Sequence, residues 1–232
     1  DIMHDPELRE LMLRYYALKG DQKPFPAVGA ALPLIAALTP SIFDEIGIVD
    51  GNTEEIPFDV KFDLVGISMM TAQADEGYRI AGEFRKRGIY TVVGGIHPTI
   101  MSDEAMLHAD TVIAGEAERT WPIFIDDFLK GRPQRIYLQS KDVDLTQSPM
   151  PRYDLIRAHN QNPYAFVQTS RGCPNHCDYC SITKAYGPQY RYKSIEQVTD
   201  EIKTIHHLHP SAKIFFSDDN MFVDKERAQQ LL

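Results

Sequence analysis

The runs FDLVGISMM (62–70), YTVVGG (90–95) and DTVIAG (110–115) are the part of this sequence that decides its fold. Each run predicts a strand, and the near-continuous apolar character of 62–70 is typical of a strand buried on both faces of a sheet. Apolar side chains recur at helical spacing in the segments that follow the runs, at 74–87, 102–108 and 119–130. Strands that alternate with helices predict βαβ units, a parallel sheet and hence an α/β fold.

The pattern extends upstream of this stretch. Residues 5–19 have helical spacing, residues 30–38 form an apolar helix pattern, and FDEIGIVD (43–50) predicts a short strand. We therefore predict a doubly wound domain over residues 1–140. The first strand usual in such a fold is missing, the chain begins without methionine, and it ends inside a predicted helix at 224–232. We expect that both ends are cut from a longer protein.

The character of the chain changes after this domain. Residues 141–163 are polar and contain QSPMP (147–151) and NQNP (160–163), so we predict a linker. A second domain follows over residues 164–232. It opens with a strand at 164–169, a run rich in cysteine, a helix at 194–206 and a strand at 213–217.

Composition limits the classes of partner. The net charge of −9 argues against a protein that binds nucleic acid, because such a protein needs a basic face. The longest apolar stretch (27–38) is shorter than the roughly 20 residues that span a bilayer, so we expect no transmembrane segment. We see no secretory signal, and the three cysteines are clustered, which favours the reducing cytoplasm.

The run CPNHCDYC (173–180) carries the clearest chemical signal. Its C-x3-C-x2-C spacing places three thiolates on one loop, and soft sulfur ligands suit an iron–sulfur cubane. Three cysteines leave one iron open to a chelating ligand. A structural zinc site is the alternative, with His176, His206, His207 or His209 as the fourth ligand. Zinc sites usually pair two close ligands with two distant ones, and the odd number of cysteines argues against disulfides.

These residues resemble the signature of the radical S-adenosylmethionine superfamily. The resemblance implies that Cys173, Cys177 and Cys180 bind a [4Fe–4S] cluster and that Tyr179 packs near the adenine of S-adenosylmethionine. It also implies that residues 164–232 are the start of a partial (β/α)6 barrel. The end of its second strand would help to hold the cofactor, through Ser217, Asp218 and Asp219. We expect Arg191 and Lys193 to be ordinary surface charges.

An α/β sheet ahead of such a barrel resembles the cobalamin-binding branch of this superfamily, whose sheet is Rossmann-like. The matching motifs are SMMT (68–71), GGIHPT (94–99) and GEAE (115–118), each at a predicted strand end. The resemblance implies cobalamin contacts from these strand ends, at Ser68, Thr71, Gly94, Gly95, His97, Gly115 and Glu116. The Asp-x-His-x-x-Gly loop of cobalamin-dependent mutases does not occur, so we expect no histidine on the lower face of cobalt.

The resemblance implies a cobalamin-dependent radical enzyme. The reaction we expect is methylation of an unactivated carbon or phosphorus through a 5′-deoxyadenosyl radical and methylcobalamin. The substrate would be a small molecule, and flavodoxin or ferredoxin would supply single electrons. One alternative keeps the cofactors but performs an oxidative cyclisation. A methylthiotransferase would need three further cysteines in the first domain, and a zinc-stabilised binding module would be no enzyme at all.

Overall fold

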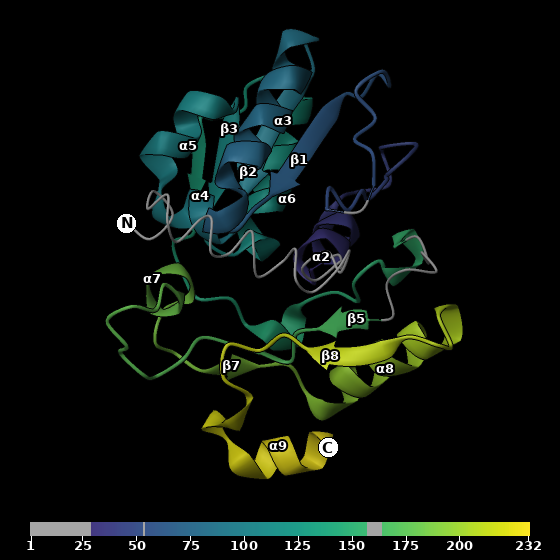
Figure 1. Cartoon of the computed structure of the whole chain (residues 1–232), viewed down its shortest axis with the longest axis vertical. Coiled ribbons are helices and arrows are strands. Elements are labelled where there is room, and N and C mark those ends of the chain that lie inside the picture. Colours follow the sequence, from purple (N-terminus) through teal and green to yellow (C-terminus); the bar gives the residue numbers. More distant parts are fainter. Residues whose placement is uncertain (1–28, 53, 157–163) are drawn as a thin grey trace, which may run out of the picture.

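The computed structural model describes residues 29–52, 54–156 and 164–232, which form two packed units (Figure 1). We call the first unit the sheet domain. Its elements are α2 (Ala31–Leu38), β1 (Leu64–Ser68), α3 (Ala74–Lys86), β2 (Tyr90–Gly94), α4 (Ile96–Ile100), α5 (Ser102–His108), β3 (Thr111–Ala114), α6 (Ala117–Leu129) and β4 (Ile136–Leu138).

The four strands form one parallel sheet in the order β1-β2-β3-β4. All four residues of β3 are buried. No residue of β1 is buried, because β1 lies at the edge of the sheet, so the prediction that 62–70 is buried on both faces was wrong. Side chains of β2 and β3 alternate between two cores because successive residues of a strand point to opposite faces. Val93 and Val112 pack with α3 and α5, while Val92 and Ile113 pack with α6. Helices therefore cover both faces, and the predicted α/β class with a parallel, doubly wound sheet is confirmed.

A second local prediction in this domain is also wrong. Residues 43–50 form no strand; instead Asp50 organises a turn, accepting hydrogen bonds from Asn52 N and Nδ2 and donating its own N–H to Glu54. The short strand β4 was missed, since three residues carry too little periodicity. The predicted helix at 5–19 lies outside the described residues.

The second unit, which we call the cysteine domain, begins after residue 163. Its elements are β5 (Tyr164–Val167), β6 (Ser170–Arg171), α7 (Ile182–Tyr186), β7 (Arg191–Tyr192), α8 (Ile195–Leu208), β8 (Lys213–Phe216) and α9 (Lys225–Leu231). Strands β5 and β8 pair in parallel with α8 between them in the chain. Ser194 caps α8 through a reciprocal capping box with Gln197.

The described part of the predicted linker packs on the cysteine domain. It contains the 3-10 turns η3 (Leu145–Gln147) and η4 (Tyr153–Leu155). Tyr153 is 2% exposed and shares a core with Val167, Val198 and Ile205. Residues 143–156 thus support the cysteine domain, while the domain limits themselves stay a prediction.

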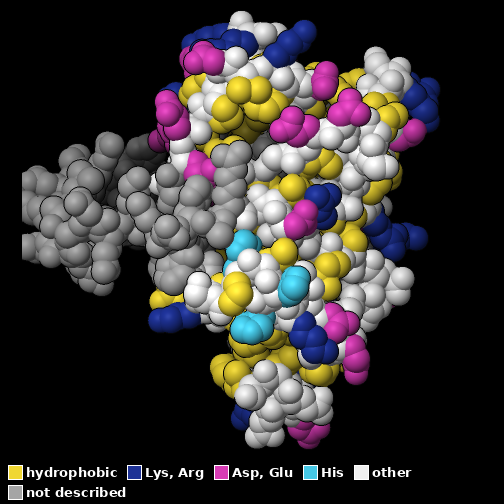
Figure 2. All heavy atoms as spheres, turned by 90° about the vertical axis from the view of Figure 1, so that its right-hand side faces the viewer, with side chains coloured by type: hydrophobic (Ala, Val, Ile, Leu, Met, Phe, Trp, Pro, Cys, Tyr) yellow, Lys and Arg dark blue, Asp and Glu magenta, His cyan; other side chains and the backbone are white. Residues whose placement is uncertain are grey.

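Charged side chains of both signs are interspersed over the face shown in Figure 2. Within the described residues, no helix combines the length and apolar character that crossing a bilayer requires.

Candidate functional site

The cysteine loop begins at Gly172, directly after β6, which a short turn connects to β5. Gly172 has φ +83°, and an ideal Cβ there would overlap the carbonyl oxygen of Gln189. Only glycine adopts this conformation without cost, and only hydrogen fits the space. The chain then runs through residues 173–180 with few internal bonds, among them Cys180 N–H to Cys177 O at 3.0 Å.

The three cysteines are free thiols, with Cys177 exposed and the other two half-buried. In the described residues no three His, Cys, Asp or Glu side chains converge on a single metal ion. In an iron–sulfur cubane each cysteine binds a different iron. Asn220 Nδ2 lies 3.8 Å from Cys173 Sγ as a hydrogen-bond donor. A soft, accessible donor set with an amide directed at one sulfur fits a cluster.

The segment 217–220 at the end of β8 lies directly beneath this loop. Asp218 ties down the turn after β5: Oδ1 accepts from Thr169 N at 2.6 Å and Ser170 N at 2.9 Å, and Oδ2 accepts from Thr169 Oγ1 at 2.5 Å. Asp219 Oδ2 accepts from Gly172 N at 2.9 Å. Ser217 Oγ donates to Val167 O. The structure therefore brings the end of β8 to the base of the cysteine loop, and the role of these residues in holding S-adenosylmethionine stays a prediction.

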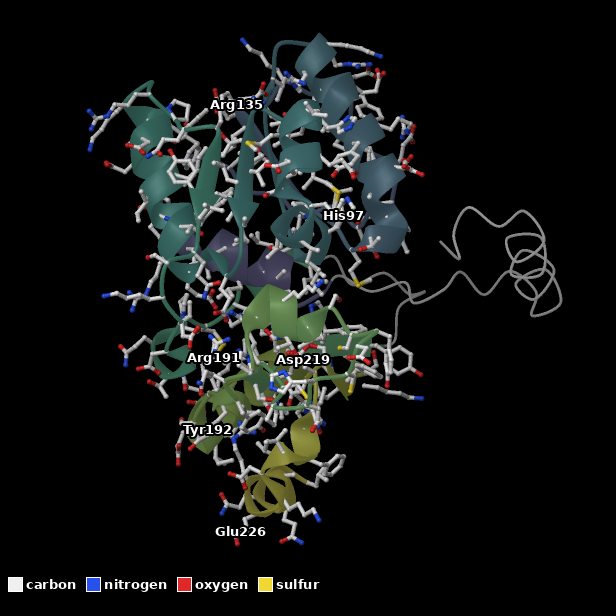
Figure 3. The ribbon with its side chains drawn as sticks, turned by 90° about the vertical axis from the view of Figure 1, so that its left-hand side faces the viewer. His97, Arg135, Arg191, Tyr192, Asp219 and Glu226 are labelled. Carbon is white, nitrogen blue, oxygen red and sulfur yellow. The ribbon has the colours of Figure 1, made fainter. Side chains whose placement is uncertain are left out.

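The two carboxylates differ in their electrostatic surroundings. Burial raises the pKa of Asp219, and the neighbouring Asp218 carboxylate adds to the effect, against the opposing bond from Gly172. Figure 3 shows Asp219 in the cysteine domain below the sheet domain. Tyr179 is 93% exposed, so its ring is available for a ligand.

The strand-end motifs of the sheet domain meet at its carboxyl edge, as the parallel topology requires. Ser68 and Thr71 are exposed there. Thr99 joins two of the motifs, donating to Gly95 O at 2.7 Å and accepting from Gly115 N at 2.9 Å. The structure brings Ser68, Gly95 and Gly115 to one edge, which suits a ligand lying across it.

The glycines at this edge make room for protein rather than for a ligand. A Cβ on Gly95, at φ +99°, would lie 2.7 Å from Met69 O and 3.0 Å from Ser68 Oγ. A Cβ on Gly115 would overlap the Gln139 side chain, and one on Gly94 would lie 3.4 Å from Ile113 O. These residues shape the edge, and their contact with cobalamin stays a prediction.

His97 is buried within the sheet domain (Figure 3). Its Nε2 lies 3.0 Å from Tyr78 Oη and 3.3 Å from Glu104 Oε1, so this nitrogen is held on the side of α3 and α5. Nδ1 is buried and has no hydrogen-bond partner in the part of the chain that the structure describes. Burial, followed by the charge of Glu104, raises the pKa of Tyr78 to about 12.

Glu116 faces the other domain. Its Oε1 pairs with Arg171 at 2.8 Å and its Oε2 with Arg191 at 2.5 Å, while Gln139 Nε2 donates to Oε2 at 2.7 Å. Arg171 also pairs with Glu118 at 2.7 Å. Burial opposes ionisation of Glu116, but the two guanidinium groups outweigh it and hold its pKa below the usual range.

The expectation that Arg191 and Lys193 are surface charges was wrong. The Arg191 side chain is 13% exposed, and Lys193 pairs with Glu201 at 2.5 Å with both side chains buried. Arg171 was missed altogether. The signal available in the sequence was a charged residue on each side of the cysteine run together with the acidic GEAE motif, because buried arginine requires an acidic partner.

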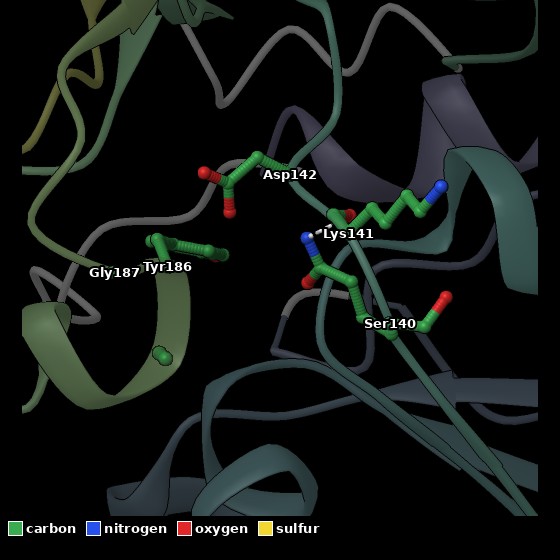
Figure 4. Close-up of a pocket in the computed structure, with 7 residues that line it drawn as sticks. Ser140, Lys141, Asp142, Tyr186 and Gly187 are labelled. Carbon is green, nitrogen blue, oxygen red and sulfur yellow. Dashed lines mark hydrogen bonds between the residues drawn. The ribbon is translucent and has the colours of Figure 1, made fainter.

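A pocket of about 200 Å³ lies in the seam between the domains (Figure 4). It is lined by residues 139–142 and 185–187, and Gln139 Nε2 donates to Lys141 O across one wall. Pockets for organic ligands usually measure ~300–1,000 Å³. We therefore assign no cofactor to this pocket.

Comparisons with known proteins address both domains. Residues 52–125 match the family model described as B12 binding domain. Two curated proteins of Chlorobaculum tepidum are similar over most of the chain. Bacteriochlorophyllide d C-12(1)-methyltransferase is 29% identical over 87% of this chain and 46% of its own length. Bacteriochlorophyllide d C-8(2)-methyltransferase is 30% identical over 91% of this chain and 50% of its own. The chain spans about half the length of these relatives.

Two solved structures share the fold. The radical S-adenosylmethionine methyltransferase TsrM from Kitasatospora setae superposes with a TM-score of 0.71 at 16% identity, covering 90% of this chain and 48% of TsrM. The cobalamin-dependent S-adenosylmethionine radical enzyme OxsB gives 0.60 at 17% identity, covering 75% of this chain and 28% of OxsB. At these identities the likeness concerns the fold, and it extends across both domains.

Proposed function

We propose that this chain belongs to the family of radical S-adenosylmethionine enzymes that carry a B12-binding domain. The chain provides the cobalamin-binding and cluster-binding parts of a methyltransferase that acts on an unactivated carbon or phosphorus of a small molecule. One observation carries the proposal: a matched B12-binding sheet and a C-x3-C-x2-C loop stand next to each other in one chain. Similarity to two methyltransferases across both parts supports it.

Cys173, Cys177 and Cys180 hold a [4Fe–4S] cluster, and Asn220 donates to the first of these sulfurs. Hydrogen bonds to cluster sulfurs adjust the reduction potential. Together the cluster, S-adenosylmethionine and cobalamin supply the radical and the methyl group, while the protein binds and orients them.

Within the end of β8 we assign S-adenosylmethionine contact to Asp219 rather than Asp218. Both oxygens of Asp218 already accept hydrogen bonds from Thr169 or Ser170. Asp219 binds the loop through Oδ2. A carboxylate beside the cluster is suited to a cationic amino group, and Tyr179 offers an exposed ring to the adenine. Ser217 positions the strand end through Val167 O.

Cobalamin lies at the carboxyl edge of the sheet, with Ser68 and Thr71 as hydroxyl donors to its nucleotide tail. Gly94, Gly95 and Gly115 shape this edge, and Glu116 at the same edge pairs with Arg171 and Arg191 of the cysteine domain. We propose that no histidine binds cobalt, because the sequence has no Asp-x-His-x-x-Gly loop and His97 is buried inside the sheet domain. We further place the enzyme in the cytoplasm with flavodoxin or ferredoxin as electron donor, since its three thiols must stay reduced.

Iron content tests the cluster. Anaerobically reconstituted chain should be brown and hold about four irons, and alanine at any of the three cysteines should remove most of them. Ser181→Ala is the matched control, because Ser181 adjoins Cys180, is exposed and makes no side-chain cap for α7. Bound zinc without visible absorption would instead indicate the zinc-stabilised module.

Cobalt spectroscopy tests the cobalamin site. The chain is incubated with hydroxocobalamin, excess is removed, and electron paramagnetic resonance is recorded in the cobalt(II) state. We expect retained cobalamin whose spectrum is the same in His97→Ala. Nitrogen hyperfine splitting that disappears in His97→Ala would contradict the histidine-free site. A folded chain that retains no cobalamin would refute the proposal. Product analysis with the full-length enzyme separates methyl transfer from the alternative, an oxidative cyclisation.

A further inference from the structure

The cysteine loop is closed at its base by a two-stranded ribbon. Strands β6 and β7 pair antiparallel, with Arg171 directly opposite Arg191. The chain between them, residues 172–190, contains all three cysteines and α7. The position of the ribbon therefore sets the position of the whole loop.

Two arginines face each other across this ribbon. Like charges directly opposite on paired strands repel. The Arg171 and Arg191 side chains are 8% and 13% exposed, so water screens them little. An anion must offset the repulsion, and Glu116 does so by giving one oxygen to each guanidinium.

Glu116 belongs to the sheet domain and is held rigidly there. It lies between β3 and α6, and its side chain is 0% exposed. Gln139, just after β4, accepts from Glu116 N and donates to Glu116 Oε2, both at 2.7 Å. The carboxylate cannot follow the ribbon without breaking these bonds, so the ribbon is fixed to the carboxyl edge of the sheet.

We propose that Glu116 is a positioning residue, which acts through Arg171 and Arg191 to fix the cysteine loop relative to the B12-binding sheet. The inference rests on the proposed function, since it concerns the geometry between the two cofactor sites. Both oxygens of Glu116 are occupied by protein groups. We therefore infer that Glu116 sets the distance between the two cofactors and contacts neither of them. We call Glu116, Arg171 and Arg191 together the clamp; Glu118 supports it through its pair with Arg171.

The test compares Glu116→Gln with Glu201→Gln in the full chain. Glu201 is an equally buried carboxylate, and its partners Lys193 and Tyr153 do not belong to the sheet domain. Both variants lose a buried ion pair, but only the first removes the carboxylate that joins both arginines of the ribbon to the sheet domain.

Amide hydrogen exchange gives a readout that needs no cofactor. We expect exchange in the peptide 169–180, which includes the protected Gly172 amide, to rise about tenfold in Glu116→Gln. It should stay within about twofold of the unmodified chain in Glu201→Gln. Equal acceleration in both variants, or none in Glu116→Gln, would overturn the proposal.

Dipolar coupling between cobalt(II) and the reduced cluster reports the distance between the cofactors. The distribution of distances between cobalt and the cluster should broaden in Glu116→Gln and stay narrow in Glu201→Gln. An unchanged distribution in Glu116→Gln that carries both cofactors would overturn the inference and leave the proposed function intact. Failure of the unmodified chain to retain cofactors would refute the proposed function, and hydrogen exchange would still decide whether the clamp exists.

A charge-balanced variant keeps the test decisive if Glu116→Gln folds poorly. The double variant Glu116→Gln/Arg191→Gln keeps the Arg171–Glu118 pair and leaves no unpaired charge in the clamp. We expect it to unfold at a higher urea concentration than Glu116→Gln while exchange in peptide 169–180 stays about tenfold faster than in the unmodified chain. Exchange at the unmodified rate would show that the bridge does not position the loop.

Discussion

Two glycines of the cysteine domain allow the cost of one steric contact to be measured. Gly172 and Gly187 have similar positive φ, +83° and +78°. A Cβ on Gly187 would meet nothing within 4 Å, whereas one on Gly172 would overlap Gln189 O. Gly187→Ala should therefore cost only the left-handed conformation, about 1–2 kcal/mol. Gly172→Ala should cost the same plus about 1–3 kcal/mol for forced movement of the backbone.

The assay is urea unfolding of the full chain, followed by far-ultraviolet circular dichroism. With a slope of ~2–3 kcal/mol per molar urea, an extra loss of about 2 kcal/mol moves the midpoint by nearly 1 M. Trp121 is the only tryptophan, so its fluorescence reports on α6 of the sheet domain in the same samples. Equal midpoints for the two variants would refute the close approach of Gly172 to Gln189, and with it the fixed base of the loop.

Three further outcomes are expected. Phe124→Ala should lower the free energy of unfolding by about 3–5 kcal/mol, because this ring is 0% exposed. Ile123→Ala is the control, because the neighbouring Ile123 is 55% exposed, and it should change the free energy of unfolding by less than about 0.5 kcal/mol. Urea unfolding measures both values. The pKa of Glu116 is lowered in the folded state, so the stabilisation by its carboxylate is present above the ordinary pKa of 4.5 and is lost as pH falls through the folded-state pKa. Glu116→Gln should therefore flatten that part of the curve of stability against pH, as measured by acid unfolding. An unaltered curve would contradict this prediction. The pKa of Tyr78 is raised from 10.0 to about 12, so its contribution to folding stability is complete below pH 10 and is lost as pH rises toward 12. Tyr78→Phe should therefore reduce the loss of stability at alkaline pH. It should also remove one tyrosine that ionises late in an absorbance titration.

The predictions from sequence succeeded where the signal is local. The strands within 62–70, 90–95 and 110–115 and the helix after each were found because hydrophobic periodicity repeats within a few residues. The prediction of a strand at FDEIGIVD (43–50) was wrong because the same local signal is insufficient there. Its short apolar pattern is typical of a strand, yet the Asp50 side chain accepts hydrogen bonds that form a turn. No local pattern distinguishes these two outcomes.

The sequence by itself predicts the ligand set of the cysteine loop, because spacing along one short loop limits which thiolates can share a cluster, and this ligand set stays a prediction. It also determined that the strand ends at Ser68, Gly95 and Gly115 meet at one edge, since parallel strands run out on the same side. Only the tertiary structure decided that Glu116 bridges Arg171 and Arg191, which lie 55 and 75 positions away. An ion pair between buried side chains depends on which surfaces the two domains press together, and charge alone does not select among the many arginines and carboxylates of the chain.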